Sequence, residues 1–160
     1  MKTIITLLLS IASILAYSAE IDRTTLSVSL PDKWVEDTND DTYNPNSFIF
    51  FDGPQSTLFT VIIGKKSAGA SVDEFVSNQK KAQAKRFQNP TITEITKWSS
   101  YEGKGFKMTG NAMGIFNAEL TVLAFEKGDS VCIIEEYATR SDYKKFANDF
   151  EKIRQTFRLK

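Results

Sequence analysis

The sequence predicts an α+β fold in which helices cover the faces of an antiparallel β-sheet. The order of patterned segments is three strands, a helix, four strands and a helix. The segments 115–125 and 130–138 are expected to form a hairpin, and these two arms carry apolar residues at both odd and even positions. Apolar side chains on both sides of a strand indicate a central strand that is covered on its two faces. An amphipathic segment at 143–157 has apolar side chains every three or four residues, which is typical of a helix packed on a sheet.

The N-terminal half of the predicted fold begins with three strands. Residues 26–30 alternate apolar and polar side chains, as a half-buried strand does. A polar stretch at 36–47, rich in Asp and Asn, predicts a loop. The apolar runs at 47–51 and 58–63 enclose the segment Asp-Gly-Pro-Gln-Ser, so they are expected to form a hairpin with a longer turn.

A helix is expected to begin after Ser71 and to end at Asn89-Pro90. Ser71 and Glu74 have the spacing of a capping box, in which each side chain accepts a free backbone N–H at the helix start. The residue before a proline avoids the α region, so Pro90 predicts the helix end. Strands are then expected at 91–98 and 106–109, before the two apolar arms.

The closing segment predicts one continuous helix. Ser141 is a good N-cap residue, and an acidic residue follows it in the first turn. The apolar side chains fall on one side of a helix with 3.6 residues per turn. These side chains are Tyr143, Phe146, Ala147, Phe150, Ile153 and Phe157. We expect them to face the core.

Residues 1–18 predict a cleavable export signal. Lys2 precedes an apolar run at 4–16, which is too short to span a bilayer, since that takes about 20 residues. Small residues stand three positions and one position before a cut after Ser18. Residues 19–160 are then expected to form a single secreted or periplasmic domain with no stable membrane insertion. An uncleaved anchor and a buried helix are the alternatives.

Composition argues against several functions. Lys plus Arg and Asp plus Glu number 20 each, whereas nucleic-acid binding calls for a cationic excess. The sequence has no His, which removes serine-hydrolase triads, His-based zinc sites and Cys–His nucleophiles. Cys132 is the only cysteine and lies in an apolar strand pattern, so a buried inert thiol is expected rather than a nucleophile. We expect no catalytic residue, no cofactor and no metal centre.

The loop from Asp37 to Asp41 partly matches a calcium-binding loop. Its acidic and amide residues occupy the first three ligand positions of an EF-hand. Thr42 stands where that loop needs Gly, and Phe48 stands where it needs a bidentate Glu, so an EF-hand is excluded. Two interpretations stay open, namely a solvated polar loop and a weak surface calcium site formed by Asp37, Asp40 and Asp41.

Glu135 and Glu136 occupy adjacent strand positions and therefore point to opposite faces of the sheet. They cannot act together as a carboxylate pair. An exposed strand end is the expected setting for both, and the alternative is that one faces the core near Cys132.

Three aromatic residues are candidates for a stacking surface for sugar or peptide. Trp34 is expected in the core because it directly follows the first strand. Trp98 and Tyr101 lie at a strand end beside two serines and a glycine, and they are the best candidates for exposed aromatic side chains.

Four local features support a family resemblance. The segment 26–34 is a strand that ends in Pro and then Trp, and 70–75 opens a helix after a strand pair. Residues 103–106, Gly-Lys-Gly-Phe, form a glycine-led middle strand, and 150–157 is a closing helix with a terminal Phe. With this order of elements, the sequence resembles the PsbP-like family, whose relatives include exported bacterial proteins of the DcrB type and a eukaryotic Ran-binding nuclear import factor.

The resemblance implies an α/β/α sandwich around an antiparallel sheet and a non-catalytic accessory or binding role in assembling a larger complex. The resemblance does not identify a ligand or a binding residue for this protein. The leading hypothesis is therefore an exported binding protein with an unknown protein partner. The alternative is a carboxylate-dependent extracellular hydrolase or an inhibitor-type protein. A hydrolase requires a pocket with two converging carboxylates, whereas a binding module presents a shallow apolar patch.

Overall fold

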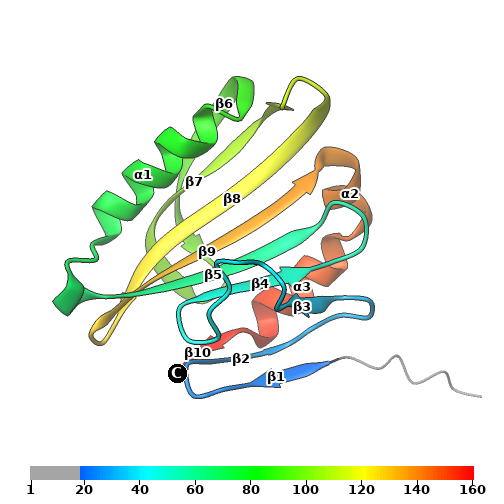
Figure 1. The fold of residues 1–160 in the computed structure, drawn as a ribbon. Coiled ribbons are helices and arrows are strands. Elements are labelled where there is room, and N and C mark those ends of the chain that lie inside the picture. The colour runs from blue at the N-terminus through cyan, green and yellow to red at the C-terminus, as the bar shows by residue number, and fades with distance from the viewer. Residues whose placement is uncertain (1–18) are drawn as a thin grey trace, which may run out of the picture.

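The computed structural model describes residues 19–160, and the predicted export signal lies outside them. Within this range, ten strands form two antiparallel sheets (Figure 1). The large sheet has the strand order β3-β4-β5-β9-β8-β7-β6, and the small one has the order β1-β2-β10. The strands are β1 (Glu20–Asp22), β2 (Leu26–Ser29), β3 (Val35–Asp37), β4 (Phe48–Asp52), β5 (Leu58–Lys65), β6 (Phe87–Trp98), β7 (Tyr101–Ala112), β8 (Phe116–Lys127), β9 (Ser130–Thr139) and β10 (Arg158–Leu159).

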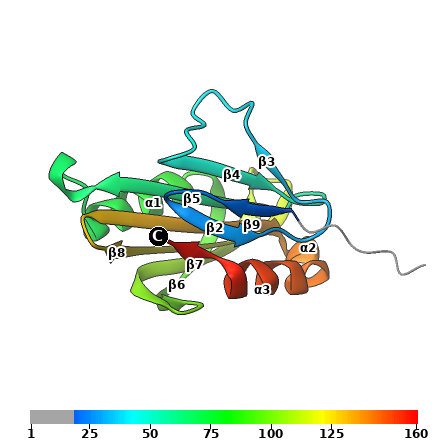
Figure 2. The same ribbon diagram turned by 90° about the horizontal axis from the view of Figure 1, so that it is seen from below.

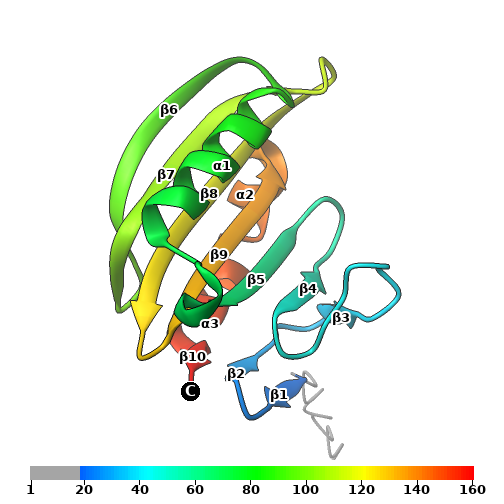
Figure 3. The same ribbon diagram turned by 60° about the vertical axis from the view of Figure 1, so that its left-hand side comes forward.

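The helices lie on both faces of the large sheet, which confirms the predicted α+β sandwich. One face is covered by α1 (Val72–Ala84), which lies across β7 and β8 (Figure 3). The other face is covered by α3 (Ala147–Thr156) and the small sheet, and Figure 2 shows β2 and β10 beside α3. A short helix, α2 (Arg140–Lys145), joins β9 to α3, and a 3₁₀ turn, η1 (Lys66–Ala68), precedes α1. Among the residues described, no helix is both long enough and apolar enough to cross a membrane.

Two separate cores lie on the two faces of the large sheet. On β8, Leu123 packs into the core beneath α3 and the small sheet, whereas Val122 packs into the core beneath α1. The expected two-sided burial of the arms at 115–125 and 130–138 is therefore confirmed. The hairpin expected from 47–51 and 58–63 is also present as β4 and β5.

The first helix begins as expected but ends early. Ser71 is its N-cap and accepts the backbone N–H of Glu74 at 3.2 Å. The helix ends at Ala84, and β6 already starts at Phe87, so the expected helix end at Asn89-Pro90 is wrong. Pro90, which has no N–H to donate, lies in a bulge of β6, where the pairing with β7 is irregular and Asn89 has φ +49°.

The predicted closing helix is two helices. Thr139 caps α2, since its Oγ1 accepts the Asp142 N–H at 3.2 Å, so the assignment of Ser141 as N-cap is wrong. The backbone leaves helical geometry at Phe146, with φ −106° and ψ 24°. This break interrupts the helical period. Phe150, Ile153 and Phe157 are fully buried as expected, but Phe146 is only part-buried and Ala147 is exposed.

Candidate functional site

The aromatic residues proposed for an exposed stacking surface are instead packed inside the protein. Trp98 is 4% exposed, and its ring stacks on Phe59 with centroids 5.8 Å apart. Tyr101 is half-buried against Phe125, and its hydroxyl accepts the Leu159 N–H at 2.9 Å. The expectation of exposure is therefore wrong for Trp98, because the C-terminal segment covers this end of β6 and β7. Trp34 is buried, as expected.

Glu136 is fully buried in the core beneath α3, so the expected exposed strand end is wrong and the core-facing alternative holds. Its carboxylate accepts hydrogen bonds from Trp98 Nε1 at 2.8 Å, from Arg154 Nε at 2.8 Å and from the Tyr143 hydroxyl at 3.1 Å. Burial, together with the charge of Glu136, raises the pKa of Tyr143. All these polar groups are satisfied by one another, which indicates a structural role.

Glu135 points to the opposite face, as its position next to Glu136 predicts. Its Oε1 is shielded from solvent and has no hydrogen-bond partner, although the residue keeps some exposed surface. Burial raises the pKa of Glu135 to about 7, while the positive charge of Arg86 acts in the other direction. The full thickness of the sheet separates the two carboxylates, so they cannot flank one substrate as a glycosidase pair does.

The remaining candidates show no reactive geometry. Cys132 is fully buried as expected, and burial raises the pKa of its thiol. In the loop from Asp37 to Asp41, Asp37 accepts the Asn39 N–H at 2.9 Å and Asp40 accepts the Thr42 N–H at 2.7 Å. Within residues 19–160, no group of three or more His, Cys, Asp or Glu side chains is placed to hold a metal ion.

The clearest surface feature is a cluster of exposed apolar side chains at the turn between β7 and β8. Met113 is 67% exposed, Ile115 68% and Phe116 56%. Of the four large hydrophobic residues that are exposed between 19 and 160, these are three. The backbone turns tightly here, with φ +52° at Met113 and +74° at Gly114. Because Ile115 lies in this turn, the strand predicted from 115 begins one residue later.

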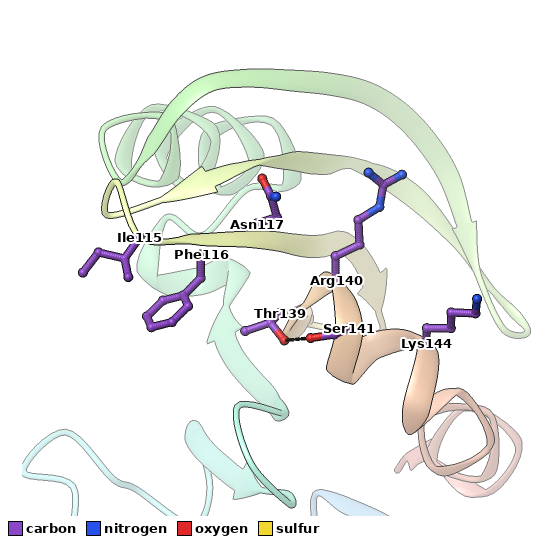
Figure 4. A pocket seen from close by; sticks show the side chains of 7 residues that line it. All are labelled: Ile115, Phe116, Asn117, Thr139, Arg140, Ser141 and Lys144. Atoms are coloured by element: carbon purple, nitrogen blue, oxygen red, sulfur yellow. Dashed lines mark hydrogen bonds between the residues drawn. The ribbon is translucent and has the colours of Figure 1, made fainter.

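An open hollow of about 520 Å³ lies between this turn and the start of α2. Ala118 pairs with Thr139 in the last register position, so the hairpin extends past the end of β9 and overhangs α2. Figure 4 shows Ile115 and Phe116 on one side of the hollow and Arg140 and Lys144 on the other. We define the hairpin-tip surface as Met113, Ile115, Phe116, Arg140 and Lys144.

The hairpin-tip surface combines apolar and cationic side chains. No acidic residue lines the hollow in the part of the chain that the structure describes. The backbone N–H of Met113 donates to the Arg86 carbonyl at 2.8 Å, which attaches the turn to the segment after α1. Sequence reasoning missed this site because Met113, Ile115 and Phe116 look like strand residues. The Met-Gly dipeptide was the one local sign of a turn.

Taken together, the two sheets and the flanking helices define the PsbP/Mog1 class of fold, which confirms the resemblance. The chain is similar to cyanobacterial PsbP (CyanoP) from Synechocystis sp. PCC 6803, at 9% identity and a TM-score of 0.53, over 93% of this chain and 96% of that one. It is also similar to the Ran-binding protein Mog1p of Saccharomyces cerevisiae, at 8% identity and a TM-score of 0.53, over 90% and 96%.

A third similar structure is LpqN of Mycobacterium tuberculosis, described as involved in cell envelope biogenesis. Identity is 8% and the TM-score is 0.51, over 89% of this chain and 90% of that one. No protein-family model and no curated protein sequence matches this chain. Identities this low show a shared fold, and fold alone does not determine function.

Proposed function

We propose that this protein is an exported, non-catalytic binding protein that holds an acidic segment of a partner protein against the hairpin-tip surface. The observation that supports this most directly is the clustering of Met113, Ile115 and Phe116, which are all more than half exposed, on one turn. Single exposed apolar residues are ordinary on a protein surface, whereas adjacent ones leave a contiguous patch in contact with water. Burying such a patch gains roughly 25 cal/mol per Å² of apolar area.

The chemistry of the partner follows from the rest of the surface. Arg140 and Lys144 line the same hollow as Ile115 and Phe116, with no acidic side chain among the lining residues described. Complementary charge guides association and selects partners, so an acidic segment with an apolar side chain fits this surface. Phe116 is the expected anchor, because aromatic residues supply much of the binding energy at interfaces.

Three further points support the proposal. Mog1p is by its name a Ran-binding protein, and LpqN is described as involved in cell envelope biogenesis. The pattern of residues 1–18 supports export. Among the described residues, the Glu136 carboxylate is already hydrogen-bonded to Trp98 and Arg154. Glu135 lies on the opposite face of the sheet, so the two carboxylates do not converge on one substrate.

The test uses a photo-crosslinking amino acid placed at Ile115 in cells of the source organism. The control places it at Ser67 in η1, which is exposed and lies beside the turn between β8 and β9, at the opposite end of β8 from the hairpin tip. We expect a partner that crosslinks from Ile115 alone, through an acidic segment identified by mass spectrometry. Equal crosslinking from both positions, or a contact segment that is not acidic, would contradict the proposal.

The purified partner then allows a quantitative measurement. We expect Phe116→Ser and Arg140→Glu each to weaken its binding at least ~tenfold, since both remove contacts at the centre of the surface. Lys81→Glu, an exposed change on α1, is the matched charge control and should leave affinity unchanged. Unchanged affinity in both tip variants would refute the proposed surface.

A further inference from the structure

A second site lies on the α1 face of the large sheet. α1 packs over β6, β7 and β8, and β9, the next strand of the sheet, lies beyond the area that α1 covers. Glu135 stands there in the middle of the sheet, paired with Val122 of β8 on one side and Thr60 of β5 on the other. A cavity of about 180 Å³ opens above it. Met113 lines this cavity, whereas Ile115 and Phe116 line the hollow at the hairpin tip.

The cavity walls are mostly apolar. Leu58, Phe87, Leu120 and Tyr137 contribute to them, Glu135 is the only acidic lining residue among those described, and Arg86 also lines the cavity. Small-molecule sites typically combine apolar walls with a few placed polar groups. An apolar cavity of about 150 Å³ can hold a molecule the size of benzene, so a body of about five carbons fits this volume.

The polar group in this cavity lacks a donor. Oε1 of Glu135 is buried without any hydrogen-bond partner, and a buried acceptor left in this state costs free energy. Glu135 keeps some accessible surface, so a donor supplied by a ligand to its carboxylate would offset this cost. A cationic donor would do so most strongly, because a charge-assisted hydrogen bond to a carboxylate is about twice as strong as a neutral one.

We infer that this cavity binds a small primary amine with a short apolar body, whose ammonium group donates to the carboxylate of Glu135 while the body contacts Leu58, Phe87 and Leu120. The other ionisable side chains that line the cavity are Tyr137, on the same face of β9, and Arg86, in the segment after α1. Arg86 opposes a second cation. Arg86 therefore limits the affinity of the cavity for an amine, and removing its charge should raise that affinity.

The probes are isoamylamine and isoamyl alcohol, which share one apolar body and differ in the head group. Binding to the purified protein is measured by calorimetry and by NMR titration. The pKa of Glu135 is raised to about 7, so its ionised fraction grows up to ~30-fold between about pH 5.5 and about pH 8.5. The amine itself stays cationic in that range, as lysine does with its pKa of about 10.4. We therefore expect amine affinity to rise up to ~30-fold over that interval and alcohol affinity to stay level.

Three variants separate this site from a general apolar cavity. Glu135→Gln should remove the preference for amine and its pH dependence while keeping the weak binding of the alcohol. Arg86→Ala should strengthen amine binding, and Lys85→Ala, an exposed neighbour outside the lining, should not. The inference is overturned if the amine binds no tighter than the alcohol near pH 8.5, if Glu135→Gln keeps full amine affinity, or if neither probe saturates.

Discussion

Arg154 of α3 donates to both carboxylate oxygens of Glu136 on β9, whose side chain is completely buried. The two residues are 18 positions apart in the sequence, and their contact attaches the C-terminal helix to the centre of the large sheet. Trp98 and Tyr143 donate to the same carboxylate. The Glu136 carboxylate is thus paired with a cation and with two neutral donors, which offsets the cost of burying it.

Removing one partner of this ion pair should be more harmful than removing both. We expect Arg154→Met to lower the free energy of unfolding by about 3–5 kcal/mol, because it leaves Glu136 buried without its cation. The double variant Glu136→Met with Arg154→Met should recover much of that loss, since no buried charge remains. Urea denaturation of the two variants and the parent protein measures both values. A double variant no more stable than Arg154→Met would contradict this account.

Glu135 should make stability depend on pH. Its pKa is raised to about 7 in the folded protein from an ordinary value of 4.5, so the folded state holds the proton more tightly than the unfolded state does. The associated stability is present below about pH 4.5 and is lost as pH rises through about 7, by an amount on the order of 3 kcal/mol.

Urea denaturation on either side of this interval tests the effect. Glu135→Gln has no titrating carboxyl at this position, so its free energy of unfolding should change less between about pH 4.5 and about pH 8 than that of the parent. The same pH dependence in variant and parent would show that another group is responsible.

Two phenylalanines of the C-terminal segment should differ in their contribution to stability. Phe150 is fully buried and lies edge-on to Trp34, with ring centroids 5.4 Å apart, so Phe150→Ala should cost about 3–5 kcal/mol. Phe146 is part-buried at the break between α2 and α3, and Phe146→Ala should cost about 1 kcal/mol. Parallel denaturation curves decide this. Equal losses would mean that the break does not separate the two side chains as described.

The export signal is tested on protein secreted by living cells. We expect the exported form to begin at Ala19, because small residues at positions 16 and 18 suit a cut after Ser18. N-terminal sequencing and intact mass identify the first residue. Ser18→Leu should slow the cut and cause uncut chain to accumulate. An exported protein that still begins at Met1 would contradict the assignment.

Local sequence patterns predicted most of the elements. The Ser71 cap, the β4–β5 hairpin and the alternating burial of β8 each depend on residues close together in the chain, and each is present in the structure. Boundaries were less well predicted where two local signals competed. Pro90 suggested a helix end but lies in a strand bulge, and Ser141 competed as a cap with Thr139.

The candidate sites could not be predicted in the same way. Alternation along β9 places Glu135 and Glu136 on opposite faces, but it does not say what covers either face. That depends on α3, which brings Arg154 to Glu136, and on α1, which ends short of β9 and leaves the cavity over Glu135. The same reasoning explains the buried Trp98 and the exposed Phe116.

The sequence by itself determined the fold class, the alternation of faces along each strand and the burial of Phe150 and Ile153 on α3, because these follow from short-range periodicity and local hydrogen bonding. Only the tertiary structure decided which polar groups are satisfied and which apolar groups remain in contact with water. Those outcomes depend on segments that are distant in the chain, such as β5 pairing with β9, and on how far each covering helix extends across the sheet.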